Sequence, residues 1–351
     1  MSNLSDRATQ WREEKLILPI WLEDGKVCII DQIKLPFTED VYRLERVEQL
    51  AKAIKDMTIR GSGAIGIAGA YGVLLAALQS NGDKKTIIDG GLLLKSTRPT
   101  AVNLMKTVDE MLMAVDGYTS SDMIEFLEAK AEEIVVRQLG YEKSLGAYGA
   151  ELIEDGDSIL THCHSGALAG AGFGGRALSV IRTAHEMGKK IHVFTSETRP
   201  YLQGARITAY ELMKWGIPHT LITDGMSGYL MRLGKIQKIV VGSDRIAANG
   251  DLLNKVGTYM HALAAKANDI PFYTATSSHT IDYLLDEGMA AKVEFRDENE
   301  VTSLNGQRIA LEGTRALYPS FDVTPNDLIT GIITEKGVMT APFIESLLKV
   351  K

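Results

Sequence analysis

In the second part of the chain, after about Gly156, short apolar runs alternate with stretches of helical periodicity. The six runs are Ser158–Cys163, Ile191–Thr195, His219–Thr223, Lys238–Gly242, Pro271–Thr276 and Leu328–Thr334. Strand-forming runs that alternate with helices are typical of a parallel sheet covered by helices on both faces. The pattern therefore predicts an α/β fold in which this part is a Rossmann-like, doubly wound domain.

The first ~140 residues have a different periodicity, in which apolar positions recur at spacings of three and four. Leu44, Val47, Leu50, Ile54 and Met57 follow this spacing within a pattern that reads as helical from Val41 to Gln79. Short strands are expected at Leu16–Trp21 and Val27–Ile30, and a further helix from Ser121 to Arg137. We predict a mostly helical domain with short strands over residues 1–145 and a Rossmann-like catalytic domain over residues 146–351.

Composition and charge narrow the class of protein. The chain of 351 residues has 38 lysines and arginines against 45 aspartates and glutamates, so its formal net charge is −7. This balance argues against a nucleic acid or an anionic membrane as a partner bound by bulk charge. The first residues are polar, and we expect no run of the ~18 to 20 apolar residues that a membrane span needs. Together these features predict a cytoplasmic protein.

The two cysteines, Cys28 and Cys163, exclude a disulfide framework and a zinc site made of cysteines alone. Cys28 has the ordinary interpretation of a small packed side chain. Cys163 stands at a strand end, where a following helix start would stabilise a thiolate or an oxyanion, although a lone cysteine is more often part of the core.

A second candidate for chemistry is Asp244, which follows the run Lys238–Gly242. The apolar strand behind this carboxyl would raise its pKa by desolvation, as a general acid requires. A helix cap or an ion pair with Arg245 explains the same placement equally well. In open α/β sheets the ligand binds beyond the carboxyl ends of the strands, where both Cys163 and Asp244 are expected.

Two other patterns suggest cofactors but are weak. His162 and His164 flank Cys163, yet alternate residues of a strand point to opposite faces, so Cys163 would face away from both and we expect no metal site. Gly170–Gly175 matches G-x-G-x-x-G, but six residues separate its first glycine from Cys163, whereas a dinucleotide fingerprint follows its strand directly. No cofactor is predicted.

Local groups of cations and amides are candidates for binding a phosphate. Arg60 stands beside Gly61, Ser62 and Gly63, which would offer backbone N–H donors, and Arg98 precedes an expected helix start at Pro99 and Thr100. Asn254 and Lys255 would begin another helix, and Gln203 supplies an amide near the strand ends. An acidic protein that binds a phosphorylated ligand must gather its positive charges locally, at Arg60, Arg98 and Lys255.

Several longer strings of residues resemble the methylthioribose-1-phosphate isomerase family over nearly the whole chain. This family shares its fold with regulatory subunits of the guanine-nucleotide exchange factor of translation initiation and with ribose-1,5-bisphosphate isomerases. The strings are Ile59–Gly61, Ser96–Leu104, Thr161–Cys163, Glu197–Arg206, Gly242–Asp251, Asn254–Tyr259, Phe321–Pro325 and Ile332–Gly337.

The resemblance implies that the protein converts an aldose 1-phosphate to a ketose 1-phosphate, with Asp244 as proton donor and Cys163 as the second catalytic group. It also implies a homodimer and no metal or nucleotide. The residues that it places around the substrate and its phosphate are Arg60, Gly61, Ser62, Arg98, Gln203, Asn254 and Lys255.

The chain departs from the family pattern at four of these segments. The usual Arg-Gly-Ala-Pro is Arg-Gly-Ser-Gly at Arg60–Gly63, and the usual Cys-Asn-Ala-Gly is Cys-His-Ser-Gly at Cys163–Gly166, which is more similar to the ribose-1,5-bisphosphate isomerases. The usual Gly-Ala-Asp is Gly-Ser-Asp at Gly242–Asp244, and the usual Asp-Thr-Ala-Asn is Asp-Leu-Leu-Asn at Asp251–Asn254. These changes leave the 5-substituent of the sugar open. The substrate would be the 5-methylthio sugar of the family or, for a paralogue, 5-deoxyribose 1-phosphate. The alternatives are a ribose-1,5-bisphosphate isomerase, a non-catalytic regulatory relative and, with less support, an NAD-dependent oxidoreductase.

Overall fold

The computed structural model describes residues 4–98 and 101–351, and its contacts divide the chain into two compact units. Unit 1 comprises the described residues up to Glu142 together with Gly166–Gly175, and unit 2 comprises Lys143–Ser165 and Arg176–Lys351. The segment Gly166–Gly175 thus belongs to unit 1, although its neighbours in the chain belong to unit 2. The sequence-based domain limits at residues 145 and 146 stay a prediction.

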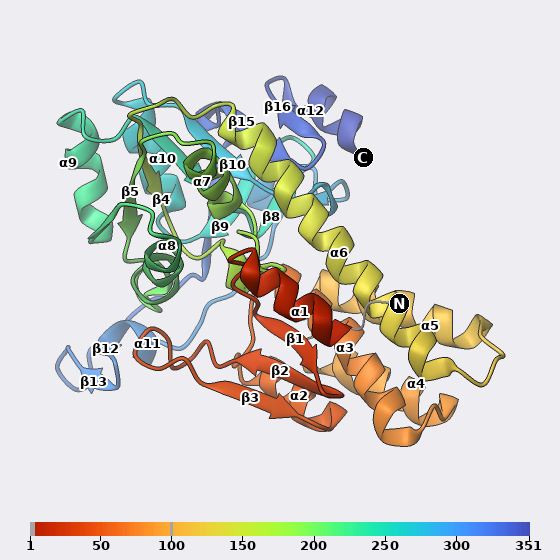
Figure 1. Ribbon diagram of the computed structural model, residues 1–351. Helices are drawn as coiled ribbons and strands as arrows, with labels where there is room; N and C mark the ends of the chain where they lie inside the picture. The colour runs from red at the N-terminus through yellow and green to blue at the C-terminus, as the bar shows by residue number, and fades with distance from the viewer. Residues whose placement is uncertain (1–3, 99–100) are drawn as a thin grey trace. The chain divides into compact units, whose positions relative to one another are not determined.

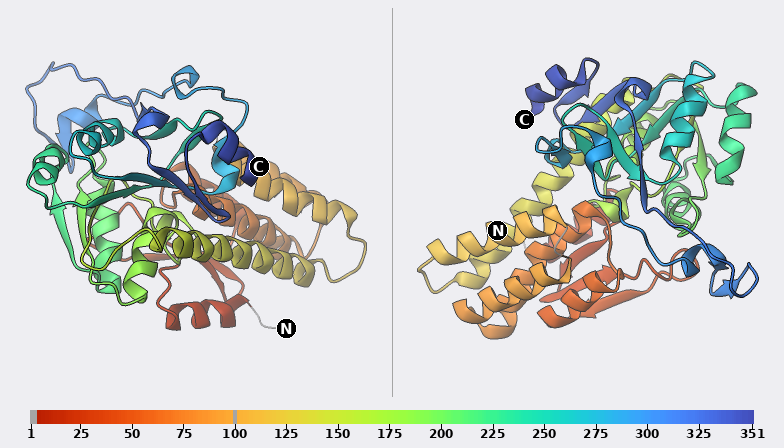
Figure 2. Two further views of the ribbon diagram at one scale, coloured as in Figure 1. Left: turned by 90° about the horizontal axis from the view of Figure 1, so that it is seen from above. Right: turned by 180° about the vertical axis from the view of Figure 1, so that it is seen from behind.

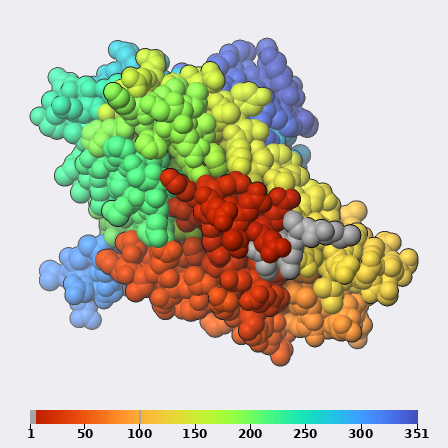
Figure 3. Space-filling model, viewed as in Figure 1, coloured from red at the N-terminus to blue at the C-terminus, as the bar shows by residue number. Residues whose placement is uncertain are grey.

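Unit 1 combines a three-stranded antiparallel sheet with helices, as Figure 1 shows. The strands, in sheet order, are β1 (Ile20–Glu23), β2 (Lys26–Ile30) and β3 (Val41–Leu44). The helices are α1 (Leu4–Glu13), α2 (Val47–Lys55), α3 (Ser62–Ser80), α4 (Lys84–Thr97), α5 (Val102–Gly117) and α6 (Met123–Ala150), whose last residues lie in unit 2. Figure 3 shows α1, in deep red, at the surface.

The expected helix over residues 41–44 is wrong, because this segment is β3. Its residues pair antiparallel with β2, with Tyr42 opposite Ile29 and Leu44 opposite Val27. Contacts between side chains on neighbouring strands stabilise a sheet. Here the pairing with β2 outweighs a local spacing of apolar residues that also fits a helix.

Helix α3 is the buried core helix of unit 1, and small residues allow its neighbours to approach. Gly69 lies against Leu104 and Val108 of α5, and Gly72 against Leu94 of α4. Ser62–Ser80 carries no charged residue. Among the described residues, it is the one helix whose length and apolar composition would suffice to cross a membrane. The expectation that no such run exists is therefore wrong. In the most apolar stretch of this helix, 83% of the residues are buried inside the protein, as in the core helix of a soluble domain. The length and composition of the helix are therefore weak evidence for a membrane span.

We expect Gly72→Ala to destabilise the protein, because the new Cβ would lie 2.5 Å from Leu94 Cδ1. Overpacking of this kind costs about 1–3 kcal/mol of the free energy of unfolding, which urea denaturation measures. Gly140→Ala in α6 is the matched control, since nothing lies within 4 Å of its Cβ position and alanine favours a helix. Equal stability changes in the two variants would contradict this account of α3 packing.

The central sheet of unit 2 has seven strands and the Rossmann order. The strands are β4 (Ser158–Thr161), β5 (His192–Ser196), β6 (His219–Ile222), β7 (Lys238–Val241), β10 (Phe272–Ala275), β15 (Gly331–Thr334) and β16 (Gly337–Met339). They lie side by side in the order β16-β15-β10-β7-β4-β5-β6, and every pair is parallel except β15 with β16. Without β16 this is the doubly wound order 6-5-4-1-2-3. All six predicted strands are confirmed.

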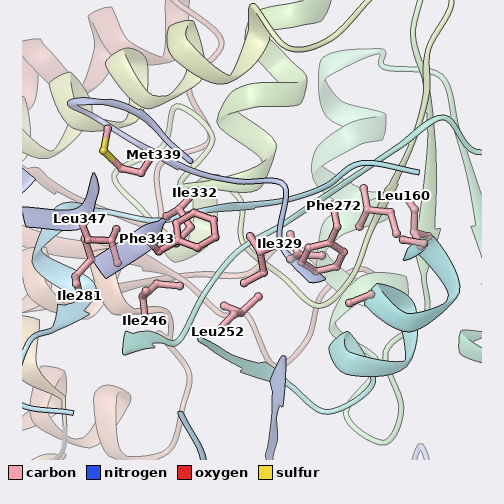
Figure 4. Close-up of a cluster of buried hydrophobic side chains, with 14 of the residues drawn as sticks. Leu160, Ile246, Leu252, Phe272, Ile281, Ile329, Ile332, Met339, Phe343 and Leu347 are labelled. Carbon is pink, nitrogen blue, oxygen red and sulfur yellow. The ribbon is translucent and has the colours of Figure 1, made fainter. Parts of the chain in front are cut away.

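Apolar side chains on the two faces of this sheet form two separate cores. Ile159, Val240 and Ile333 belong to one cluster, with α7 (Ala177–Glu186) and α8 (Ala209–Trp215). Their neighbours in the chain, such as Leu160 and Ile332, belong to the other cluster, part of which Figure 4 shows. Successive residues of a strand point to opposite faces, so the continuous apolar runs in the sequence reflect burial on both sides.

The rest of unit 2 consists of short elements, shown from two further sides in Figure 2. A four-stranded sheet has the order β11-β8-β9-β14, and β12 pairs with β13. These strands are β8 (Arg245–Ala247), β9 (Leu252–Lys255), β11 (Ile281–Asp282), β12 (Ser303–Leu304), β13 (Gln307–Arg308) and β14 (Phe321–Thr324), and the remaining α-helices are α9 (Ser227–Arg232), α10 (Thr258–Lys266), α11 (Asn299–Thr302) and α12 (Phe343–Ser346).

Candidate active site

Cys163 and Asp244 lie beyond the carboxyl ends of two neighbouring strands of unit 2. Cys163 follows β4, Asp244 follows β7, and the two strands pair in parallel. The strand order reverses between β4 and β7, and ligands of open α/β sheets bind outside the carboxyl ends at such a switch point. The sheet topology therefore puts the two predicted catalytic residues at the position where this fold binds ligands.

The backbone of Cys163 is held in the left-handed region, with φ of 67°. Its N–H donates to Thr198 Oγ1 at 2.8 Å, and its carbonyl accepts from Thr208 Oγ1 at 2.8 Å. The expected helix start beside this thiol is wrong, because only a short 3-10 turn, Ala167–Ala169, intervenes before α7 begins at Ala177. Two threonine hydroxyls, rather than a helix dipole, define the surroundings of Cys163.

Asp244 is exposed, so the burial that we expected to raise its pKa is absent from these surroundings. Its backbone N–H donates to Leu253 O at 3.0 Å, which holds the turn between β7 and β8. The preceding Ser243 donates to Thr276 Oγ1 at 2.5 Å, and Gly242 leaves room for Ser165, whose Oγ would lie 2.1 Å from a Cβ at that position. Hydrogen bonds of the backbone of Asp244 and of the side chain of Ser243 thus fix this loop.

His162 and His164 point to different elements. His164 Nε2 lies 2.8 Å from Glu211 Oε1 of α8, and both side chains are buried. His162 lies 3.0 Å from Val256 O and 3.2 Å from His261 of α10. The strand alternation that we assumed around Cys163 is wrong, because β4 ends at Thr161 and the left-handed Cys163 turns the chain.

The buried His162 and His261 and the half-buried Asp224 form a cluster whose possible ligand atoms lie within 4.8 Å of one another, as a metal site would require. However, all four ring nitrogens of the two histidines already have hydrogen-bond partners within the protein. Val256 O can only accept, so His162 Nε2 carries the proton and Nδ1 accepts from His261 Nε2. His261 Nδ1 then accepts from Ser227 Oγ at 2.8 Å. Burial lowers the pKa of both histidines, which favours these neutral rings.

The predicted phosphate-binding residues of unit 2 are buried. Asn254 and Lys255 lie in β9, so the helix expected to begin there is wrong: α10 begins at Thr258. Asn254 Nδ2 donates to Thr258 Oγ1 at 3.0 Å, and Lys255 Nζ to Ser320 O at 2.7 Å. Gln203 is buried, and its Oε1 accepts no hydrogen bond from the described residues.

The N-terminus of α10 already holds an anion of the protein itself. Asp322 Oδ2 accepts from the N–H groups of Gly257 at 2.7 Å and Tyr259 at 3.2 Å. Burial raises the pKa of Asp322 to about 6, although these N–H groups and Lys255 lower it. A phosphate at this helix end would compete with that carboxylate.

The predicted phosphate-binding residues of unit 1 lie at helix ends. Gly61 has φ of 98° and precedes α3, and a Cβ there would come within 2.3 Å of Ala169. Ser62 Oγ accepts from Asn103 of α5 at 2.7 Å. Arg60 and Arg98 are half-buried, and Pro99 and Thr100 lie outside the described residues. The structure thus brings Gly61 and Ser62 to one end of α3, and the predicted site residues fall in both units.

The glycine-rich stretch Gly170–Gly175 surrounds a carboxylate of unit 1. Glu142 accepts backbone N–H groups from Ala171, Phe173, Gly174 and Gly175. Burial raises the pKa of Glu142 to about 7, although the four N–H groups lower it. The stretch therefore binds a carboxyl group supplied by the protein itself.

Sequence reasoning assigned no role to Thr198 and Thr208, whose hydroxyls bond to the backbone of Cys163, or to Asp224, which bonds to the backbone of Thr198. Thr198 and Asp224 lie two residues beyond the ends of β5 and β6, and this position after an apolar run was the signal that could have found them. It also missed Arg176, whose guanidinium donates to Thr280 Oγ1 at 2.8 Å and to Thr276 Oγ1 at 3.3 Å.

Comparison with known proteins identifies relatives over nearly the whole chain. Residues 58–341 match the Initiation factor 2 subunit family. The chain is 47% identical to the methylthioribose-1-phosphate isomerase of Thermosipho africanus, covering 94% of this chain and 96% of that protein. It is 45% identical to the protein of the same name from Chloroflexus aurantiacus, covering 93% of this chain and 96% of that one.

Two solved structures have closely similar folds. The 5-methylthioribose 1-phosphate isomerase of Pyrococcus horikoshii has a TM-score of 0.91 at 38% identity, over 96% of both chains. The translation initiation factor eIF-2B subunit delta from A. fulgidus has a TM-score of 0.90 at 39% identity, over 95% of this chain and 98% of that one. With 47% identity to a named isomerase over 94% of its length, the chain belongs to the methylthioribose-1-phosphate isomerases of the Initiation factor 2 subunit family.

Proposed function

We propose that this protein isomerises a 5-substituted ribose 1-phosphate to the corresponding ribulose 1-phosphate, and that the 5-methylthio sugar is its substrate. The observation that carries the proposal is the placement of Cys163 and Asp244 at the switch point between β4 and β7, in a chain 47% identical to a named isomerase. Such an activity belongs to methionine salvage.

The chemistry requires an acid, because the phosphate on the anomeric oxygen blocks simple ring opening. A proton delivered to the ring oxygen lets the bond between that oxygen and C1 break, with its electron pair passing to the oxygen. Hydrogen then moves from C2 to C1, and the C2 hydroxyl loses its proton to give the ketone. The proton gained and the proton lost balance, so the net change is an isomerisation.

We assign the proton donor to Asp244 and the second catalytic role to Cys163. Because Asp244 is exposed, bound substrate must cover its carboxyl to favour the protonated form. Cys163 would stabilise developing charge or exchange protons with the substrate oxygens. The hydrogen shift proceeds either as a hydride migration or through an enediol, and both routes use the same two residues.

The remaining assignments extend this proposal. We infer that Arg60, Gly61, Ser62, Arg98, Gln203, Asn254 and Lys255 bind the substrate and its phosphate. A homodimer, a cytoplasmic location and the absence of nucleic-acid and membrane partners stay predictions of the sequence.

A second candidate substrate is 5-deoxyribose 1-phosphate. The observation behind it is that the chain departs from the family pattern in the phosphate loop and in both catalytic loops, at Ser62, His164 and Ser243.

The test is a rate comparison on methylthioribose 1-phosphate, 5-deoxyribose 1-phosphate and ribose 1,5-bisphosphate, with ketose 1-phosphate formation as the measurement. We expect kcat/KM for one of the first two to exceed that for the bisphosphate by about tenfold or more, equivalent to 1.4 kcal/mol. A preference for the bisphosphate would overturn the choice of substrate. No turnover of any pentose phosphate by folded protein would favour a regulatory relative instead.

A further inference from the structure

The conformation of Cys163 needs an explanation beyond its own sequence. A residue with a Cβ rarely adopts φ near 67°, so contacts must hold it there. Two threonine hydroxyls form hydrogen bonds with the backbone of this residue. Thr198 Oγ1 accepts from its N–H, and Thr208 Oγ1 donates to its carbonyl, each at 2.8 Å. Thr198 therefore contributes directly to the placement of the thiol.

Thr198 is itself in an unfavourable conformation, with φ of 66°. This is more unusual than for Cys163, because threonine is branched at Cβ. Its side chain is fully buried, and its single hydroxyl proton is donated to Ser196 O at 3.0 Å. The hydroxyl oxygen can then only accept from Cys163, so the direction of this hydrogen bond is fixed.

The carboxylate of Asp224 holds the turn that carries Thr198. Its Oδ1 accepts from the N–H of Thr198 at 2.8 Å and from the hydroxyl of Ser196. Its Oδ2 accepts from the N–H of Arg199 at 2.7 Å. All three partners are donors, so both oxygens must accept, and an asparagine would present an N–H₂ group to one of them. The site requires an aspartate.

We propose that Asp224 is a positioning residue for Cys163, acting through the turn Ser196–Arg199 and the hydroxyl of Thr198. The connection runs from the end of β6 through the end of β5 to the end of β4, from the edge of the sheet to its switch point. Its relevance to catalysis rests on the proposed role of Cys163.

The neighbouring histidines offer a competing role for Asp224, since His162 Nδ1 lies 3.9 Å from its Oδ1 and the three groups resemble a metal-ligand set. The three donors on the carboxylate and the hydrogen bonds of both rings favour positioning over ligation. Metal binding is therefore one outcome of the test.

The experiment compares full-length Asp224→Asn, Thr198→Val and Thr198→Ser by the rate at which iodoacetamide alkylates Cys163, with Cys163→Ser used to identify the modified site. Asp224→Asn removes a charge and Thr198→Val does not. We expect both to change the alkylation rate in the same direction and to lower kcat about tenfold with KM within about threefold, whereas Thr198→Ser stays near the wild type. An effect of charge alone would alter only Asp224→Asn and would overturn the proposal.

Asp251→Asn is the matched control, because Asp251 likewise accepts from two backbone N–H groups, those of Gly288 and Asn326. Its alkylation rate should equal that of the wild type. Unchanged alkylation in folded Thr198→Val, or Co²⁺ binding that is lost in Asp224→Asn, would contradict the positioning role. Alkylation needs no substrate, so the comparison tests the positioning of Cys163 even if the proposed isomerase activity is not found. Failure of the positioning role can therefore be told apart from failure of the proposed function.

Discussion

Replacing Asp244 with asparagine should lower kcat for ketose 1-phosphate formation by about 100-fold to 10,000-fold, the usual contribution of a general acid. Asparagine keeps the shape of the side chain but has no acidic proton for the ring oxygen. Because Asp244 is exposed, the free energy of unfolding should change by less than about 0.5 kcal/mol. Steady-state kinetics and urea denaturation of the same preparation measure both effects.

Asp282→Asn is the control for this prediction. Asp282 lies in β11 next to β8 and forms an ion pair with Arg245 at 3.4 Å, so its loss changes the charge near Asp244 without removing the proposed acid. Its kcat should stay within about threefold of the wild type. Near wild-type turnover in Asp244→Asn would remove the assigned role of Asp244.

The largest effect on stability is expected from Glu142→Leu. Four backbone N–H groups of the stretch Ala171–Gly175 would lose their buried acceptor, and each unsatisfied buried donor costs about 1–3 kcal/mol. We expect a loss of about 4 kcal/mol or more in the free energy of unfolding. Glu125→Leu, at an exposed position of the same helix, should change it by less than about 0.5 kcal/mol. Equal losses would contradict this role of Glu142.

The same residue makes a pH-dependent contribution. The pKa of Glu142 is raised from 4.5 to about 7 on folding, mainly by burial, so the folded state favours the protonated carboxyl. This stabilisation is complete below about pH 4.5 and is lost as the pH rises through 7. Relative to Glu142→Gln, which does not titrate, the wild type should therefore lose about 3 kcal/mol over this interval. A difference that is constant with pH would contradict it.

The sequence predicted the parts of the fold that depend on buried apolar runs. The six parallel strands of the Rossmann sheet lie within the apolar runs of the sequence, and their parallel arrangement places Cys163 and Asp244 beyond the carboxyl ends of neighbouring strands. The small sheet of β8, β9, β11 and β14 could not be predicted, because its strands do not lie in continuous apolar runs; β9, for example, contains Asn254 and Lys255. Asn254 and Lys255 were consequently assigned to a helix.

The surroundings of individual side chains were less predictable than the positions of the strands. The exposure of Asp244 and the left-handed backbone of Cys163 depend on turns, and turns are set by contacts between residues far apart in the chain. The hydrogen bond from Cys163 to Thr198 joins positions 35 residues apart, and that from Ala171 to Glu142 joins positions 29 apart. The local pattern of apolar and polar residues does not predict hydrogen bonds between residues so far apart in the chain.

The assignment of Gly166–Gly175 to unit 1 bears on how the protein is made. During synthesis Glu142 emerges from the ribosome before the N–H groups that donate to its carboxyl oxygens, and β4 of unit 2 is made between them. Unit 1 cannot close around this carboxylate until residue 175 has appeared, so the usual order of domain-by-domain folding from the N-terminus does not apply to it. The first unit to begin is completed only after the second has started.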